Sequence, residues 1–277
     1  MGRGGSSLRA PARRRGGESV SDGERPGKAD LHIHTALGDG MASPQDILDY
    51  VETETDLDVI AITDHDDLRG AVQTREAWAK RNYRFQVIPG IEVTAIEGHI
   101  IALFVEEPLP SLRPAEEVLK AVHRQGGLAI AAHPLNWLTR SLDEKALERI
   151  AHSSEEGAFL DGLETANQAP GARGRLKRVV TLNRQRYRLA EVGGSDAHFL
   201  KVIGSAYTEF PGRSAEDLRR SIVERASQGV NGRHPTLLEI GPWQVMRQAW
   251  RGLTVTPRNL GWGATAGSFV KRIFSVR

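Results

Sequence analysis

The chain has 277 residues, with 37 basic and 35 acidic side chains, and a formal net charge of +2 is too small to indicate nucleic-acid binding by itself. Cysteine is absent, which excludes disulfides, thiolate zinc sites and a cysteine nucleophile, and favours a reducing, cytoplasmic compartment. No uninterrupted apolar run approaches the roughly 20 residues of a membrane-spanning helix, and the N-terminus lacks the apolar segment of a signal peptide.

Three segments are predicted along the chain. Residues 1–27 are rich in Gly, Ser and Arg and contain almost nothing apolar to bury, which predicts a disordered tail. Residues 28–234 have the length of one α/β barrel domain. Residues 235–277 are expected to form a C-terminal helical extension.

From residue 28 short apolar runs alternate with helical stretches, which predicts a mostly parallel sheet wrapped by helices. Strands are expected at 29–34, 59–63, 86–92, 99–105, 128–132, 160–165, 190–195 and 205–210. Helices are expected at 44–55, 68–80, 114–125, 142–152, 173–186 and 214–228. Ser43 and Ser214 stand where N-caps are needed, immediately before two of these helices.

Side chains that can bind metal ions recur where the expected strands end. His32 and His34 stand two apart on the first strand and therefore project from one face, and Asp196 and His198 do the same after the seventh. Because barrels of parallel strands place their active sites at the carboxyl ends of the strands, the pattern predicts a single polar mouth. Nine candidate ligands result: His32, His34, Asp39, His65, Glu92, His99, His133, Asp196 and His198.

A ligand set rich in imidazole and carboxylate favours zinc, manganese or iron over calcium or magnesium. A single histidine is more often a hydrogen-bonded or surface group than a ligand. We assign that ordinary role to His123, His152 and His234, which lie away from the strand ends. The recurrence of ligand types at several strand ends is what favours a metal centre.

These segments closely resemble the PHP family, which is named for its polymerase-associated and histidinol-phosphatase members. The matching motifs, in chain order, are Asp30-Leu31-His32-Ile33-His34-Thr35 with Gly38-Asp39-Gly40, Ile62-Thr63-Asp64-His65-Asp66, Gly90-Ile91-Glu92-Val93, Gly98-His99, Ala132-His133-Pro134 and Gly194-Ser195-Asp196-Ala197-His198. The resemblance covers residues 28–210. It implies a distorted seven-stranded (β/α) barrel, with the nine candidates as ligands of two to three divalent ions that hydrolyse phosphate esters. One departure is Gly38, where many relatives have serine.

In such a centre the ions lower the pKa of a water molecule and neutralise the phosphoryl oxygens, so no covalent nucleophile is needed. We assign Glu92 as the carboxylate that bridges two ions, and we group it with Asp196 and His198 as catalytic residues. Asp64 and Asp66 flank His65 and are candidates to orient its ring. A solvated loop position is the alternative for Asp66.

Substrate contacts are predicted from basic residues near the mouth. The segment between residues 167 and 190 carries seven basic residues and no acidic one, and it makes Arg173 and Arg175 candidates to bind phosphate. A solvated helix face is the commoner meaning of such a run. Lys201, three residues after His198, is the better single candidate.

The C-terminal segment places large apolar side chains at helical spacing, and the charged residues among them are basic and never acidic. Packing against the barrel is the favoured interpretation, and contact with an anionic membrane surface is the alternative. The residues concerned are Trp243, Met246, Trp250 and Leu253, then Trp262, Phe269 and Ile273.

A small phosphorylated substrate of nucleotide type is expected, because a long polynucleotide needs a continuous basic track. A 5′-3′ exonuclease or oligonucleotide phosphodiesterase of the same family is the alternative. An amidohydrolase is the runner-up from another class, since those enzymes also begin with a His-x-His pair. A relative without activity is disfavoured by the full ligand set.

Overall fold

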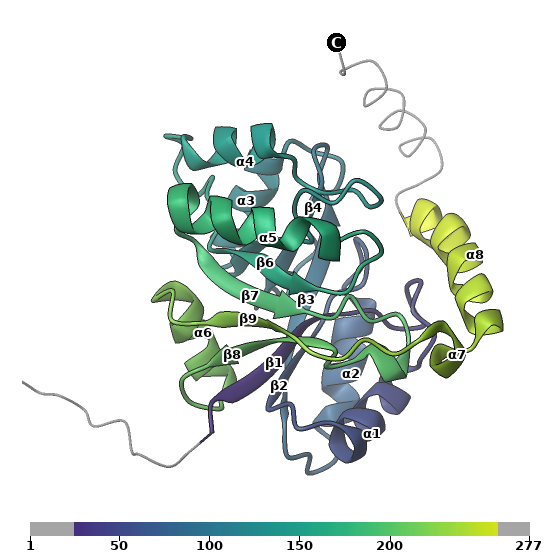
Figure 1. The fold of residues 1–277 in the computed structure, drawn as a ribbon. Helices are drawn as coiled ribbons and strands as arrows, with labels where there is room; N and C mark the ends of the chain where they lie inside the picture. Colours follow the sequence, from purple (N-terminus) through teal and green to yellow (C-terminus); the bar gives the residue numbers. More distant parts are fainter. Residues whose placement is uncertain (1–24, 260–277) are drawn as a thin grey trace, which may run out of the picture.

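The computed structural model describes residues 25–259, and a single nine-stranded sheet wrapped by helices forms its centre (Figure 1). The strand order is β7-β6-β5-β4-β3-β2-β1-β8-β9. The strands are β1 (Gly27–Ile33), β2 (Val59–Ile62), β3 (Gln86–Thr94), β4 (His99–Leu103), β5 (Leu128–Ala131), β6 (Gly162–Asn167), β7 (Ala190–Gly194), β8 (Ala206–Phe210) and β9 (Gln228–Asn231).

The helices lie in the expected segments, except that α6 ends five residues before the expected end at residue 228 and the short turn η2 was not expected. They are α1 (Pro44–Glu54), α2 (Arg69–Trp78), α3 (Ala115–Arg124), α4 (Glu144–Ala151), α5 (Arg173–Leu182), the π-helical turn η1 (Asn183–Tyr187), the 3-10 turn η2 (Leu200–Val202), α6 (Ala215–Val223), α7 (Leu237–Ile240) and α8 (Pro242–Asn259). Ser43 and Ser214 cap α1 and α6 as expected, because each side chain accepts a hydrogen bond from the third residue of its helix.

The sheet curls until its two halves meet, so it forms a nearly closed barrel. Ala197, just after β7, bridges Ile33 at the end of β1. Its amide donates to the His32 carbonyl at 3.1 Å, and its carbonyl accepts from the His34 amide at 3.0 Å. The closure therefore joins the two segments that carry the paired metal-type residues.

The sheet differs from the expectation in strand number and direction. It has nine strands, whereas the family resemblance implied seven and the apolar runs predicted eight; β8 was expected, and β9 is the additional strand that pairs antiparallel with it. It is mixed rather than mostly parallel, since β4 runs antiparallel to both β3 and β5. Only residues 95–98 connect β3 to β4, which is too short for a parallel crossover.

The strands are buried on both faces, which explains their continuous apolar runs. Successive side chains of β2 alternate between two separate clusters. Ile60 and Ile62 belong to one cluster, and Val59 and Ala61 to the other. The core thus holds each strand in one register, and this register fixes which residues reach the end of the barrel.

The ends of the described chain are attached to the barrel. The boundary expected after residue 27 comes too late, because Arg25 pairs with Asp58 at 2.7 Å and Gly27 begins β1, while residues 1–24 lie outside the described residues. The C-terminal extension forms α7 and α8, while Trp262, Phe269 and Ile273 lie outside the described residues. Between residues 25 and 259 no helix is long and apolar enough to cross a membrane.

Candidate metal centre

All nine candidate ligands lie at one end of the barrel. Most follow or end a strand whose carboxyl end points to this mouth. His99 instead begins β4, and it reaches the same mouth because β4 runs antiparallel to β3, which carries Glu92. The ligands therefore gather at one mouth as expected, although His99 comes from the start of a strand rather than its end.

Glu92 lies at the centre of the cluster and is fully buried. Its Oε2 atom lies 3.0 Å from His32 Nε2, 3.3 Å from His34 Nε2 and 3.2 Å from His65 Nδ1. Its Oε1 atom lies 2.8 Å from His99 Nδ1 and 3.0 Å from His133 Nε2. Both oxygens thus face several imidazoles, which is the arrangement a carboxylate needs to bridge two ions.

Asp196 and Asp39 supply the other carboxylates. Asp196 Oδ1 lies 3.2 Å from His34 Nε2 and 3.5 Å from His32 Nε2. Asp39 Oδ2 lies 3.2 Å from His198 Nε2. Three groups within the described residues offer ligand atoms within 4.8 Å of one another: His34, Asp39, His65 and His198; His32, His34, Glu92 and Asp196; and His65, Glu92 and His99.

The donor atoms themselves fit cations. Five buried ligand atoms make no hydrogen bond among the described residues: His34 Nδ1 and Nε2, His65 Nδ1, His99 Nδ1 and Asp39 Oδ1. Buried polar atoms without partners cost free energy unless something binds them. Divalent ions would satisfy these atoms, and imidazole and carboxylate donors are suitable for zinc, manganese or iron.

The ligands also shift one another's proton affinity. Burial raises the pKa of Glu92, but the surrounding imidazoles, His65 foremost, outweigh it and hold the pKa well below its ordinary value. Burial lowers the pKa of His99 to about 4, so this imidazole is neutral at pH 7 and free to bind a metal ion.

Two ligands are held in unusual backbone conformations. Asp196 has a φ of 52° and His133 a φ of 30°, both in the left-handed region that residues other than glycine seldom adopt. Such strain persists where the surrounding structure fixes it, and it clusters at functional sites. The backbone at both positions is thus shaped to present a side chain to the centre.

Glu164 is a buried carboxylate of the site that the sequence analysis missed. It lies in β6, three residues before the end of the strand. Its Oε1 lies 3.1 Å from His32 Nδ1, and its Oε2 accepts from the His133 amide at 2.6 Å. It therefore orients the ring of one candidate ligand and the backbone of another.

Asp64 and Asp66 hold loops rather than His65. Asp64 accepts hydrogen bonds from the amide and hydroxyl of Thr35, both at 2.6 Å, and burial raises its pKa to about 6. Asp66 accepts from the amide of Thr94 at 2.7 Å and from its hydroxyl at 2.6 Å. Each carboxylate thus ties a ligand-bearing segment to a neighbouring strand end.

A cavity of about 360 Å³ opens over the ligands, and helices α7 and α8 form part of its wall. Its apolar lining residues are Phe199, Val202, Leu237, Ile240 and Val245, and its neutral polar ones include Thr139, Gln168 and Gln248. His234 also lines the cavity, although it belongs to none of the three groups of potential metal ligands among the described residues. No local pattern places His234 at the mouth, because the chain returns there only after β9.

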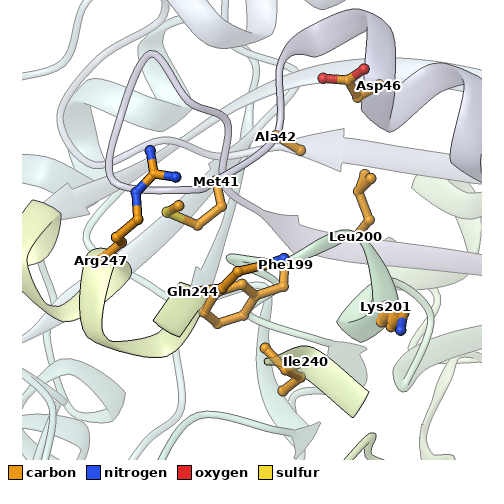
Figure 2. A pocket seen from close by; sticks show the side chains of 9 residues that line it. All are labelled: Met41, Ala42, Asp46, Phe199, Leu200, Lys201, Ile240, Gln244 and Arg247. Carbon is orange, nitrogen blue, oxygen red and sulfur yellow. The ribbon is translucent and has the colours of Figure 1, made fainter. Parts of the chain in front are cut away.

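The predicted substrate contacts lie outside this cavity lining. Lys201 donates to the Glu239 carbonyl at 2.8 Å and lines a neighbouring pocket of about 330 Å³. Figure 2 shows this second pocket, with Lys201 and Arg247 on opposite sides of the view. Arg173 donates to Gln168 Oε1 at 3.0 Å, and Arg175 is exposed on α5.

The rest of the basic run is paired with acidic side chains. Arg178 and Arg186 both contact Glu144, and Arg184 contacts Glu191. These pairs lie on the exposed surface of α5 and η1, and they favour the interpretation of a solvated helix face. His123 and His152 have the ordinary roles assigned to them: His123 contacts Asp161 at 3.0 Å, and His152 is exposed.

Comparison with known proteins connects this site to other sequences. A family model described as PHP-associated matches residues 182–227. An uncharacterized protein of Methanocaldococcus jannaschii is 34% identical over 151 residues, which is 50% of this chain and 81% of the relative. The 5′-3′ exoribonuclease Rnm of Salmonella typhimurium is 26% identical, over 59% of this chain and 52% of the relative.

A shorter match links the chain to the 3′,5′-nucleoside bisphosphate phosphatase of Chromobacterium violaceum, with 31% identity over 30% of each protein. Among solved structures, a two-domain protein from Bacteroides vulgatus containing a predicted PHP-like metal-dependent phosphoesterase has a TM-score of 0.59. It is 22% identical, with 80% of this chain and 70% of that chain covered, which indicates a shared fold. The barrel, the cluster of histidines and carboxylates and these relatives agree: the chain belongs to the PHP family of metal-dependent phosphoesterases.

Proposed function

We propose that this protein hydrolyses small phosphate esters of nucleotide type, with water as the nucleophile and two to three divalent ions as cofactors. The observation that carries the proposal is Glu92, whose two oxygens lie among five imidazoles at the floor of a small cavity. The nine ligands would hold the ions. When bound, divalent ions lower the pKa of a water molecule and neutralise the phosphoryl oxygens.

The side chains of the protein keep this centre ordered. Glu92 and Asp196 would provide negative charge that balances the bound cations. Glu164 holds His32 in one orientation, because its carboxylate lies 3.1 Å from His32 Nδ1 and leaves Nε2 facing the centre. Asp196 and His198 approach from the segment that closes the barrel, so barrel closure and ligand placement are linked.

The cavity supports a small substrate. Its volume of about 360 Å³ is near the lower end of the range of roughly 300–1,000 Å³ for ligand pockets. Its lining within the described residues contains no lysine or arginine. Apolar walls with Gln168 and Gln248 suit a neutral leaving group, such as a nucleoside, better than a chain of phosphates.

A 5′-3′ exonuclease acting on oligonucleotides is the second candidate. The pocket shown in Figure 2 shares Phe199 and Ile240 with the metal cavity and carries Lys201 and Arg247. A nucleic-acid strand that ran from the metal cavity into this second pocket would pass two basic side chains, Lys201 and Arg247. The similarity to an exoribonuclease also supports this candidate.

A comparison of substrates tests the proposal. Chelated protein is reloaded with manganese, zinc or iron and assayed with a nucleoside monophosphate, a nucleoside 3′,5′-bisphosphate and a single-stranded oligonucleotide. We expect the highest kcat/KM with a mononucleotide substrate and release of inorganic phosphate. A higher kcat/KM for the oligonucleotide, with a rate that falls steeply with salt, would establish the exonuclease instead. Lack of hydrolysis of all three by the metal-loaded protein would reject both candidates.

A further inference from the structure

Helix α8 carries a row of large apolar side chains that face away from the barrel. Trp243, Met246, Trp250 and Leu253 recur at helical spacing and form the α8 stripe. The relative exposures of the two tryptophans are 67% and 69%. The favoured expectation that these four side chains pack against the barrel is therefore wrong.

The opposite side of α8 makes the contacts with the barrel. Val245 and Gln248 line the metal cavity, and Arg251 donates to the Ala36 and Gly38 carbonyls at 2.7 and 2.6 Å. Figure 1 shows α8 lying along one side of the barrel. Since the helix already uses one side for the barrel, the α8 stripe is free for another surface.

The exposed apolar side chains concentrate in this region. Leu237 and Leu238 on α7 and the four residues of the α8 stripe are exposed, although Leu237 also lines the metal cavity and is therefore not part of the outward-facing stripe. These are six of the eleven exposed large hydrophobic side chains found between residues 25 and 259. Single exposed apolar residues are common, but four on one side of a helix mark a surface that binds something.

The charge of the segment identifies the chemistry of its partner. Residues 240–277 contain no acidic residue and six basic ones: Arg247, Arg251, Arg258, Lys271, Arg272 and Arg277. Arg247 is exposed on α8, one residue from Met246 in the stripe. A stripe with two tryptophans, on a helix whose charged residues are all basic, is complementary to an anionic lipid surface.

We propose that the α8 stripe docks onto an anionic membrane surface. Tryptophan rings settle at the boundary between headgroups and acyl chains, and basic residues are attracted by anionic headgroups. A second copy of the chain is a poorer partner, because a two-fold contact through α8 would place the same basic side chains against each other. Docking would hold the mouth of the metal cavity beside the membrane, since α8 is part of the cavity wall.

The test uses the full-length protein and vesicles, and it needs no substrate, so its result is independent of the proposed hydrolysis. Flotation is measured with vesicles of phosphatidylcholine alone and of phosphatidylcholine mixed with phosphatidylglycerol. We expect flotation with the mixed vesicles only, weakened by salt, and a blue shift of tryptophan fluorescence on binding. The double variant Trp243→Ser/Trp250→Ser should bind at least about tenfold more weakly, because two exposed rings no longer insert.

Val223→Ser is the control, because Val223 is exposed on α6, which lies on the opposite side of the barrel from α8 (Figure 1), and it should not affect flotation. Circular dichroism shows whether each variant is folded. Absence of flotation of the folded wild-type protein with mixed vesicles overturns the proposal. Equal weakening by Val223→Ser overturns it too, and so does a wild-type dimer in analytical ultracentrifugation that the double variant converts to monomer.

Discussion

Arg251 of α8 donates a hydrogen bond to the Gly38 carbonyl at 2.6 Å, directly before the candidate ligand Asp39. The same guanidinium nitrogen donates to the Ala36 carbonyl at 2.7 Å. Two backbone carbonyls of the ligand turn are therefore fixed by a helix more than 200 residues later in the chain. This contact makes Arg251 a positioning residue for Asp39, while the metal-binding atoms belong to other side chains.

Arg251→Met keeps most of the length of the side chain and removes its hydrogen bonds. We expect metal affinity and kcat to fall about 10-fold to 100-fold, the usual effect of losing a group that orients a ligand. Arg247→Met on the same helix is the control, since Arg247 is exposed and makes none of these contacts. Metal titration, kcat and KM are measured for both variants. Equal metal affinities of the Arg251→Met and Arg247→Met variants would show that Arg251 does not position Asp39.

Gly194→Ala should displace His32 and Glu164 and so disturb the metal centre. A Cβ atom at Gly194 would lie 2.6 Å from the Cβ of His32 and 2.6 Å from Glu164 Oε1. The added methyl group therefore pushes apart the pair that orients His32. We expect a loss of about 1–3 kcal/mol in the free energy of unfolding, as for other overpacked interiors, and weaker metal binding.

Gly174→Ala on α5 is the matched control, because a Cβ there meets no atom within 4 Å. Alanine favours helix, so this variant should be neutral or more stable by up to about 1 kcal/mol. Urea unfolding of the two variants gives the comparison. If both glycine positions tolerate alanine equally, the close approach at Gly194 has no energetic consequence.

The sequence predicted those parts of the site that depend on strand ends. His32, His34 and Glu92 lie where alternating side chains and apolar runs placed them, since the register of a buried strand is fixed by its own pattern. Nearly all strands and helices were located for the same reason. Local pattern was sufficient wherever a residue and its function belong to one element.

The parts it did not predict depend on how distant elements pack. Glu164 lies within a strand, where a carboxylate has no local signal of its partner on β1. His234 and α8 reach the cavity because the chain comes back to the mouth after β9, and no local pattern indicates this. Strand β9 was also missed, because Gln228-Gly229-Val230-Asn231 is short, contains glycine and lacks a regular apolar alternation.

Glu92→Gln tests the bridge directly. The amide keeps the shape of the side chain but removes the charge that would hold two cations together. We expect a fall of about 10³-fold or more in kcat and a lower number of bound ions, while circular dichroism stays unchanged. Glu76→Gln, at an exposed position of α2, should retain activity. Near-normal turnover and metal content of the Glu92 variant would contradict the assignment.

Asp58 fastens the first strand to the rest of the barrel. Its carboxylate lies 2.7 Å from Arg25 Nη1 and 2.7 Å from Arg213 Nη2, and it accepts from the Lys28 amide at 3.0 Å. Burial raises the pKa of Asp58, but the hydrogen bonds from Arg25 and Arg213 outweigh this and hold the pKa below its ordinary value. The charged form is therefore the one that stabilises the fold.

Asp58→Asn should lower the free energy of unfolding by about 1–2 kcal/mol at pH 7, a modest value because both arginines are partly exposed. The stabilisation by Asp58 is fully present above the pKa of an unfolded aspartate, about 3.9, and is lost as the pH falls through the lower folded pKa. The difference between wild type and variant should accordingly shrink only in strong acid. Asp56→Asn, which removes an exposed partner of Lys28, is the control and should change little. Urea unfolding at pH 7 and at successively lower pH values measures both variants. A difference that stays constant into strong acid, or that is equal for the two variants, would show that the charge of Asp58 does not stabilise the fold.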